Sequence, residues 1–138
     1  MEIRKAMTRE EIREQTMQIV FQMDLSNNFD YSQINIVAEN QKALKKKQAL
    51  DTLTAIRDHI AEIDAVITKN TDKWNTERIA KTEMAILRIA VSELLYVESI
   101  PSAVSINEAV ELAKKYGDDR SYAFVNAVLS SIYKGMES

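Results

Sequence analysis

Apolar residues are unevenly spaced along the chain, and the densest run lies between Thr82 and Tyr96. On a helix of 3.6 residues per turn, its apolar side chains cover nearly the whole circumference. They are Met84, Ile86, Leu87, Ile89, Ala90, Val91, Leu94 and Leu95. Because a helix that is apolar on all sides is normally buried, we expect other helices to pack around it. The run is too short to cross a bilayer, and Glu83, Arg88 and Glu93 interrupt it.

The N-terminal half shows one-sided apolar spacing, which is typical of amphipathic helices. Thr8 followed by Glu11 matches a capping box, and the helix it begins should end near the helix-stopping residues 26–28. The inward stripe of this helix is Ile12, Thr16, Ile19, Val20 and Met23. A less regular pattern predicts a short helix from Tyr31 to Glu39. Apolar residues at every third or fourth position then predict a long helix from about Leu44 to Thr68.

Two further helices are predicted after the central run. Pro101 breaks the chain, because the residue before a proline is pushed out of helical geometry. Ser105 with Glu108 matches a second capping box, and Gly117 is placed to end that helix in a left-handed conformation. One of the aspartates at 118–119 then caps the last helix. Its apolar stripe is Phe124, Val125, Val128, Leu129, Ile132 and Tyr133.

Composition agrees with this pattern. The 138 residues include two glycines and one proline, whereas a β-rich protein of this size usually needs more turn formers. We therefore predict an all-α fold, a single compact domain over residues 1–138, with about seven helices around a buried central one. Trp74 should anchor a loop onto the core, and Thr76 to Lys81 should add a helical turn before the central helix.

No pattern in the sequence favours an enzyme. Cysteine is absent, which excludes disulfides, thiolate metal sites and a cysteine nucleophile. The sole histidine, His59, has Asp58 and Glu62 nearby, but this trio is typical of an exposed helix face rather than a metal site. Phosphate-binding, nucleophile-elbow and zinc-protease motifs are also missing. We expect no catalysis, cofactor or metal, and the N-terminus carries no apolar leader, so the expected location is cytoplasmic.

The net charge of −3 gives no global attraction to nucleic acid, so such binding needs a local patch or a basic partner. Lys5, Arg9 and Arg13 are spaced by four, so they lie along one edge of the first helix if that helix begins early. Arg9 lies in a first turn, where a cation opposes the helix dipole, and helix N-termini also offer free N–H groups to phosphate. This edge is a candidate anion site. The alternative is an ordinary surface neutralised by glutamates such as Glu10 and Glu11.

Several linked motifs resemble one family. AILRIAVSEL, then IP, INEAVELAKKYG and FVNAVL resemble the C-terminal half of the NusB family of bacterial transcription antitermination factors. Arg9, Arg13, Glu14 and Gln18 are similar to its N-terminal arginine motif. The resemblance implies two packed helical bundles without catalysis. It also implies binding of the boxA element of ribosomal RNA leader transcripts with ribosomal protein S10 (NusE), within the RNA polymerase antitermination complex.

The resemblance also assigns roles to individual residues. It implies that Arg9 and Arg13 contact RNA phosphates, and that Glu77 and Glu83 accept hydrogen bonds from base amino groups. Phe124 would stack on an unpaired base, although it also fits the core stripe of the last helix. Five other matching residues are expected to be buried or capping groups that hold helices together. They are Arg88, Glu93, Asn107, Glu108 and Asn126.

The partner contact departs from the family pattern. Some relatives have an acidic residue just before the last helix's serine, whereas this chain has Arg120 before Ser121. Asp118 and Asp119 are the candidates to replace that contact. A function of another class also stays open: a non-enzymatic protein-interaction module or homodimeric helical bundle, in which the RNA surface is masked. Neither alternative involves a membrane.

Overall fold

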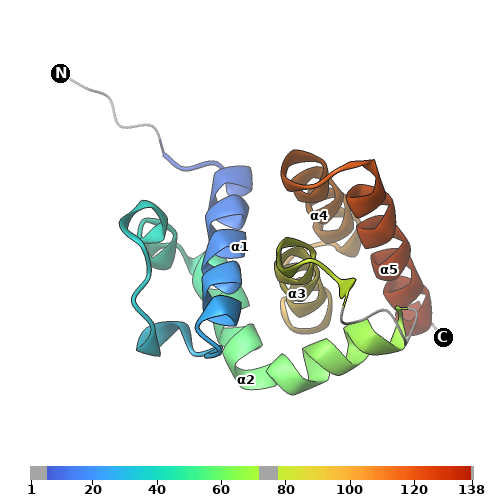
Figure 1. Ribbon diagram of the computed structural model, residues 1–138, viewed down its shortest axis with the longest axis horizontal. Helices are drawn as coiled ribbons and strands as arrows, with labels where there is room; N and C mark the ends of the chain where they lie inside the picture. The colour runs from blue at the N-terminus through green and yellow to red at the C-terminus, as the bar shows by residue number, and fades with distance from the viewer. Residues whose placement is uncertain (1–5, 72–77, 138) are drawn as a thin grey trace.

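The computed structural model describes residues 6–71 and 78–137. Its α-helices are α1 (Arg9–Leu25), α2 (Lys47–Lys69), α3 (Lys81–Tyr96), α4 (Ser102–Tyr116) and α5 (Asp119–Glu137). Figure 1 shows α3 in the middle, with α1 to its left, α4 and α5 to its right, and α2 running beneath it from α1 toward α5. All four helices contact α3. The described ranges contain no strand, and the predicted all-α fold around a central helix is confirmed. Within them, no helix has the length and apolar character needed to span a bilayer.

The central helix is buried on every side, as its apolar pattern predicts. Each residue from Ala85 to Glu93 is buried. The charge of Arg88 is compensated there: its Nε lies 2.9 Å from Asp64 Oδ1 and its Nη1 lies 3.1 Å from Asp24 Oδ2. Burial alone would lower the pKa of Arg88, but the two carboxylates more than offset this and raise it. The expectation that a charge inside this segment must be paired is therefore confirmed.

The start of α1 also agrees with the sequence. The backbone N–H of Glu11 donates to Thr8 Oγ1 at 3.0 Å, and the backbone N–H of Thr8 donates to Glu11 Oε1 at 3.3 Å. Both halves of the predicted capping box are therefore present. All five residues of the predicted stripe are buried. The helix ends at Leu25, and Asn27 takes a positive φ of 51° just beyond it.

Helix α2 contains a kink that the sequence does not reveal. His59 has φ −131° and ψ 22°, which interrupts the helical geometry, although neither proline nor glycine occurs there. The His59 ring stacks on Tyr96 of α3, with 4.0 Å between ring centroids. After the kink, α2 runs past α3 toward α5 (Figure 1), where the Ser131 hydroxyl donates to Asn70 Oδ1 at 2.7 Å. The kink thus lets one helix contact both halves of the molecule.

The predicted helix from Tyr31 to Glu39 is wrong. The segment before α2 forms three short 3₁₀ turns: η1 (Tyr31–Gln33), η2 (Ala38–Asn40) and η3 (Ala43–Lys45). Side chains satisfy the backbone between them. Asp30 accepts from the backbone N–H of Ser32, and Gln22 of α1 bonds to the backbone of both Asn35 and Val37. Such bonds compete with a continuous helix.

Two predictions near α4 are also wrong. Ser105 does not cap the helix, which begins three residues earlier; its side chain is buried and donates to Glu93 Oε1 at 3.2 Å. Gly117 is extended, with φ −124°, rather than left-handed. Glycine is needed there for space, because an added Cβ would lie 2.4 Å from Ser121 Cβ. The predicted cap of the last helix is confirmed: Asp118 Oδ1 accepts from the backbone N–H of Arg120 and of Ser121, both at 3.0 Å.

Candidate functional site

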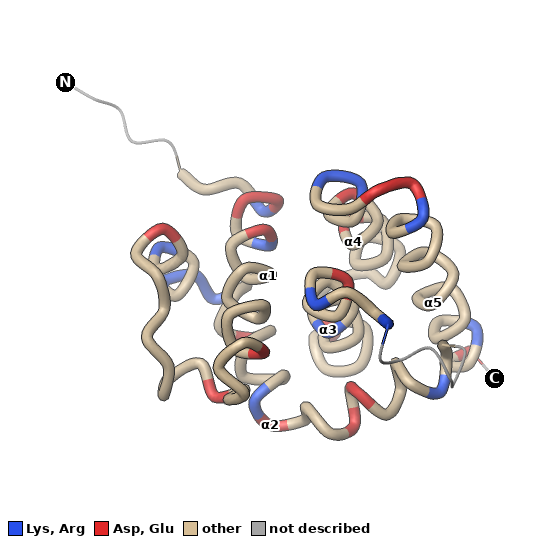
Figure 2. Tube along the Cα trace, in the orientation of Figure 1, with Lys and Arg blue, Asp and Glu red and all other residues tan. Residues whose placement is uncertain are grey.

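The N-terminal half of α1 lies beside the C-terminal end of α4. Lys115 Nζ lies 2.9 Å from both carboxylate oxygens of Glu14. The Tyr116 hydroxyl donates to Glu14 and accepts from Gln18 Nε2 at 3.1 Å. Figure 2 shows that charged residues gather at this end of the molecule, over the start of α1 and the turn from α4 into α5. We call the exposed cations here the basic end; they are Arg9, Lys114, Lys115 and Arg120.

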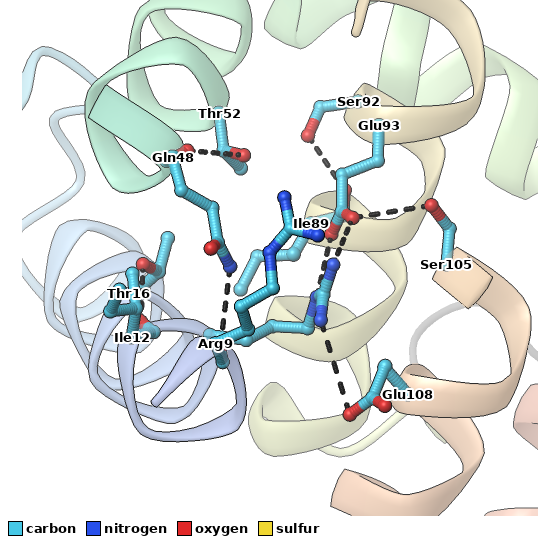
Figure 3. A network of polar contacts seen from close by, with 11 residues as sticks. Arg9, Ile12, Thr16, Gln48, Thr52, Ile89, Ser92, Glu93, Ser105 and Glu108 are labelled. Atoms are coloured by element: carbon cyan, nitrogen blue, oxygen red, sulfur yellow. Dashed lines mark hydrogen bonds and ion pairs between the residues drawn. The ribbon is translucent and has the colours of Figure 1, made fainter. Parts of the chain in front are cut away.

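Arg9 is the first residue of α1 and is exposed. Its backbone carbonyl accepts from Gln48 Nε2 at 3.2 Å, which ties the start of α1 to α2 (Figure 3). Within the described residues its guanidinium has no carboxylate within ion-pair distance. A cation at a helix N-terminus opposes the helix dipole. This side chain is therefore available to an external anion.

Arg13 occupies a different environment. It is 6% exposed, its Nη2 lies 2.7 Å from Glu93 Oε1 and its Nε lies 3.2 Å from Glu93 Oε2. Its Nη1 lies 3.9 Å from Glu108 Oε2, and Ser105 donates to the same Glu93 carboxylate (Figure 3). The resemblance implied a phosphate contact for Arg13. The structure instead places its guanidinium at the junction of α1, α3 and α4, where it joins three helices.

Glu83 does not lie at the basic end. It is in the first turn of α3, where its Oε1 accepts from the backbone N–H of Ala80 at 3.0 Å. The neighbouring Lys81 pairs with Asp24, which lies near the other end of α1. The 15 residues from Arg9 to Asp24 correspond to roughly 22 Å along the helix axis. Glu77 is outside the described residues, as are Trp74 and the first two residues of the turn predicted from Thr76 to Lys81; α3 itself begins at Lys81.

The RNA-binding and partner-binding residues predicted around the start of α5 lie directly after α4. Phe124 is half-buried and packs against the core, so part of its ring serves the fold. The Asp118 carboxylate caps α5, and the bond from the backbone N–H of Ser121 helps to hold its pKa below the ordinary value. Asp119 and Arg120 are exposed, and neither forms an ion pair within the described residues. These two side chains are therefore available to a partner.

Sequence reasoning missed two lysines that lie beside tyrosines. Lys114 Nζ is 5.3 Å from the ring centroid of Tyr122, and Lys115 Nζ is 5.7 Å from that of Tyr116. The sequence feature that could have identified them is KKYG at the end of the predicted helix, where cations interact favourably with the helix dipole. Interleaved cations and aromatic rings also suit the binding of single-stranded nucleic acid. Glu14 holds the pKa of Lys115 above its ordinary value through a hydrogen bond and its charge.

Comparison with known proteins identifies the family. A sequence model described as the NusB family matches residues 10–134. The chain belongs to the NusB family. It is 37% identical over 134 residues to the transcription antitermination protein NusB of Finegoldia magna, covering 96% of this chain and 98% of that protein. It is 41% identical over 128 residues to the protein of the same name from Agathobacter rectalis, covering 90% and 98% respectively.

Solved structures extend the likeness to three dimensions. NusB of T. maritima superposes with a TM-score of 0.80 and 33% identity, covering 94% of this chain and 93% of that one. NusB in a complex of the antitermination factors NusB and NusE with double-stranded RNA superposes with a TM-score of 0.69 and 28% identity, covering 92% and 96%. The resemblance identified from the sequence motifs is therefore confirmed.

Proposed function

We propose that this chain is a transcription antitermination factor that binds the boxA element of ribosomal RNA leader transcripts together with NusE, so that RNA polymerase reads through terminators. The basic end is the observation that carries the proposal. It brings exposed cations and tyrosine rings from α1, α4 and α5 together, among exposed carboxylates such as Glu10, Glu11 and Asp119, on one part of an acidic protein. Its small number of cations suits modest RNA affinity, which a basic partner would increase. We place this activity in the cytoplasm and assign the chain no catalytic step.

Arg9, Lys114 and Lys115 are the phosphate-contacting residues of the proposal, since all three are exposed cations at one end of the bundle. Phe124 would stack on an unpaired base with the exposed part of its ring. Arg13 acts indirectly in this scheme: its ion pair with Glu93 holds the N-terminal half of α1 against α3 and α4. Arg13 is therefore a positioning residue rather than a phosphate ligand.

The remaining assignments follow the family resemblance. Glu77 and Glu83 would accept hydrogen bonds from base amino groups, because a carboxylate repels phosphate but is able to read a base edge. RNA reaching Glu83 would have to extend along the molecule away from the basic end. Asp119 and Arg120 would contact NusE, together with any free oxygen of the capping Asp118 carboxylate.

Charge reversal at Arg9 tests the proposal. Arg9→Glu should weaken binding of boxA RNA to the complex with NusE by about tenfold and lower the salt slope by about one, since one phosphate contact is lost. The control is Lys134→Glu, which makes the same charge change on the exposed last turn of α5. Equal binding by both variants in a fluorescence anisotropy titration would remove Arg9 from the interface.

A homodimer with a masked RNA surface is the competing arrangement. Sedimentation of the wild-type chain at several concentrations, with and without boxA RNA and NusE, separates the two. The proposal requires that RNA and NusE bind the monomer or dissociate a dimer. A dimer that neither ligand dissociates, and that binds neither, would overturn it.

A further inference from the structure

A cluster of lysines lies where the chain enters α2. Residues 40–50 contain four lysines and no acidic side chain. The last of them, Lys47, pairs with Asp51, with 2.6 Å between Nζ and Oδ2. The other three make no ion pair within the described residues. We call these three the lysine patch; they are the exposed Lys42 and Lys45 and the half-buried Lys46.

The backbone under the lysine patch is anchored to the core. Ala43 of η3 is fully buried, and Leu44 packs against the core. The backbone N–H of Lys45 donates to the carbonyl of Lys42 at 3.2 Å, which closes a 3₁₀ turn. Side chains three residues apart on such a turn point the same way, so both ammonium groups project from one side of η3. Two like charges held on one side repel each other, and an external anion would relieve that repulsion.

The lysine patch adjoins the start of α1. Gln48, two residues after Lys46, donates from its Nε2 to the backbone carbonyl of Arg9 at 3.2 Å (Figure 3). Two residues of chain span at most about 7 Å. Figure 2 shows the cations of the segment before α2 on one side of α1 and those of the turn from α4 into α5 on the other. The start of α1, with Arg9, therefore connects the lysine patch with the rest of the basic end.

We propose that the lysine patch binds phosphates of the leader RNA that adjoins the boxA element, so that the strand continues from the basic end across the start of α1. This inference rests on the proposed function, because it takes that RNA as the ligand. An ammonium group attracts phosphate as a point charge, and phosphate contacts carry no sequence information. The lysine patch should therefore bind the adjoining RNA whatever its sequence. It would add affinity that a protein of net charge −3 otherwise lacks.

Other occupants fit less well. A membrane surface is usually bound by an amphipathic helix with an apolar face beside its lysines, whereas Ala43 and Leu44 between these lysines serve the core. An acidic protein surface would match the charge, but the lysine patch continues into Arg9, which the proposed function assigns to RNA phosphate. Glu10 and Glu39 are exposed carboxylates on adjoining elements. Because they repel phosphate, neutralising two of the three lysines should remove the attraction.

RNA titrations of the complex with NusE test the inference, using boxA alone and boxA extended at both ends. Lys42→Gln combined with Lys45→Gln should weaken binding of the extended RNA by about tenfold. It should also lower the salt slope by about 1.4, since two phosphate contacts of a single strand are lost. Binding of boxA alone should not change. Lys42→Arg combined with Lys45→Arg keeps the charge and should preserve binding of both RNAs.

The matched control is Lys69→Gln combined with Lys134→Gln. It removes two exposed lysines from the ends of α2 and α5 that likewise make no ion pair within the described chain. An equal loss of affinity in this control would mean that only net charge matters, and it would overturn the inference. Thermal unfolding of each variant checks that it remains folded.

The other outcomes separate the inference from the proposed function. Unchanged binding of the extended RNA by the folded glutamine variant would overturn the inference and leave the proposed function intact. Equal loss on both RNAs would place the lysines at boxA itself, and weaker NusE binding in the absence of RNA would assign them to a protein; either result would also overturn it. A dependence on the sequence of the extension would replace phosphate contacts with base contacts and do the same. Failure of the wild-type complex to bind boxA would overturn the proposed function itself.

Discussion

Two arginines of one sequence motif, four residues apart on α1, lie in opposite surroundings. Arg9 is exposed at the basic end and makes no ion pair within the described residues. Arg13 is buried and pairs with Glu93, which also accepts from Ser105. The motif therefore combines a side chain available for recognition with one that fixes the helix. Replacing either arginine should impair RNA binding, but only the loss of Arg13 should also unfold the protein.

The largest expected effect is at the buried member of the pair. Arg13→Met should destabilise the fold by about 3–5 kcal/mol, because it leaves the Glu93 carboxylate buried without its cation. The Glu93 side chain is 2% exposed, so water is unable to replace the lost partner. Urea unfolding followed by circular dichroism measures the change. Arg9→Met should shift the same curve by less than about 0.5 kcal/mol, as expected of a surface substitution.

A double variant separates the charge of Arg13 from its role in positioning α1. Arg13→Met combined with Glu93→Leu removes both charges and should recover most of the lost stability, since apolar replacement of a whole buried pair is often neutral. RNA binding by this variant then shows whether the position of α1, without the charge of Arg13, is enough for binding. Recovered stability with recovered RNA binding would confirm Arg13 as a positioning residue. If stability recovers but RNA binding does not, Arg13 itself contacts an RNA phosphate.

A second buried arginine should have an intermediate effect. Arg88 of α3 is as buried as Arg13, but its partners Asp24 and Asp64 are 18% and 36% exposed. Loss of Arg88 leaves carboxylates that water is able to reach, so Arg88→Met should cost roughly 2 kcal/mol, less than Arg13→Met. Urea unfolding under the same conditions ranks the two. The reverse order would show that solvent access of the partner does not determine the cost.

The difference between Arg9 and Arg13 also shows which features of the fold the sequence is able to predict. The central helix and the stripe of α1 depend on local periodicity, so apolar spacing alone identifies them. The environment of Arg13 depends on Glu93, which is 80 residues away, and no local pattern reveals that contact. A buried carboxylate of α3 also explains the failed cap at Ser105, because the hydroxyl predicted to cap α4 instead donates to Glu93.

Two other structural features that the sequence did not predict also depend on contacts with a different helix. The segment from Tyr31 to Glu39 has helical spacing, but Gln22 of the preceding helix binds its backbone and prevents a continuous helix. The kink at His59 accompanies a stack with Tyr96, a residue of another helix. Among the candidate site residues, exposure separates Arg9 from Arg13, and exposure depends on tertiary packing. The motif identified the correct family without distinguishing the two roles.

The smallest expected effect concerns the surface network that joins α1 to α4. Burial raises the pKa of Glu14, but hydrogen bonds from Tyr116 and Lys115 outweigh this and hold it below its ordinary value of 4.5. A carboxyl group whose pKa is lowered on folding contributes stability that is present above its unfolded pKa and is lost as the pH falls through the folded pKa. The contribution of Glu14 should therefore be lost in acid, whereas that of Lys115, whose pKa is raised, should be lost only in strong alkali. It is exposed and screened, so its total contribution is small.

Lys115→Met isolates that contribution. The pKa of Glu14, followed by carbon-13 NMR of its carboxyl group, should rise in the variant because a cation and a hydrogen bond are lost. Stability at neutral pH should change little, in contrast to the loss at Arg13, while the dependence of stability on pH below about 4.5 should become shallower. An unchanged Glu14 pKa would show that Tyr116 alone fixes this carboxylate. Lys115 would then be as free as Arg9 and Arg120, and the basic end would present three unpaired cations without any help from a partner.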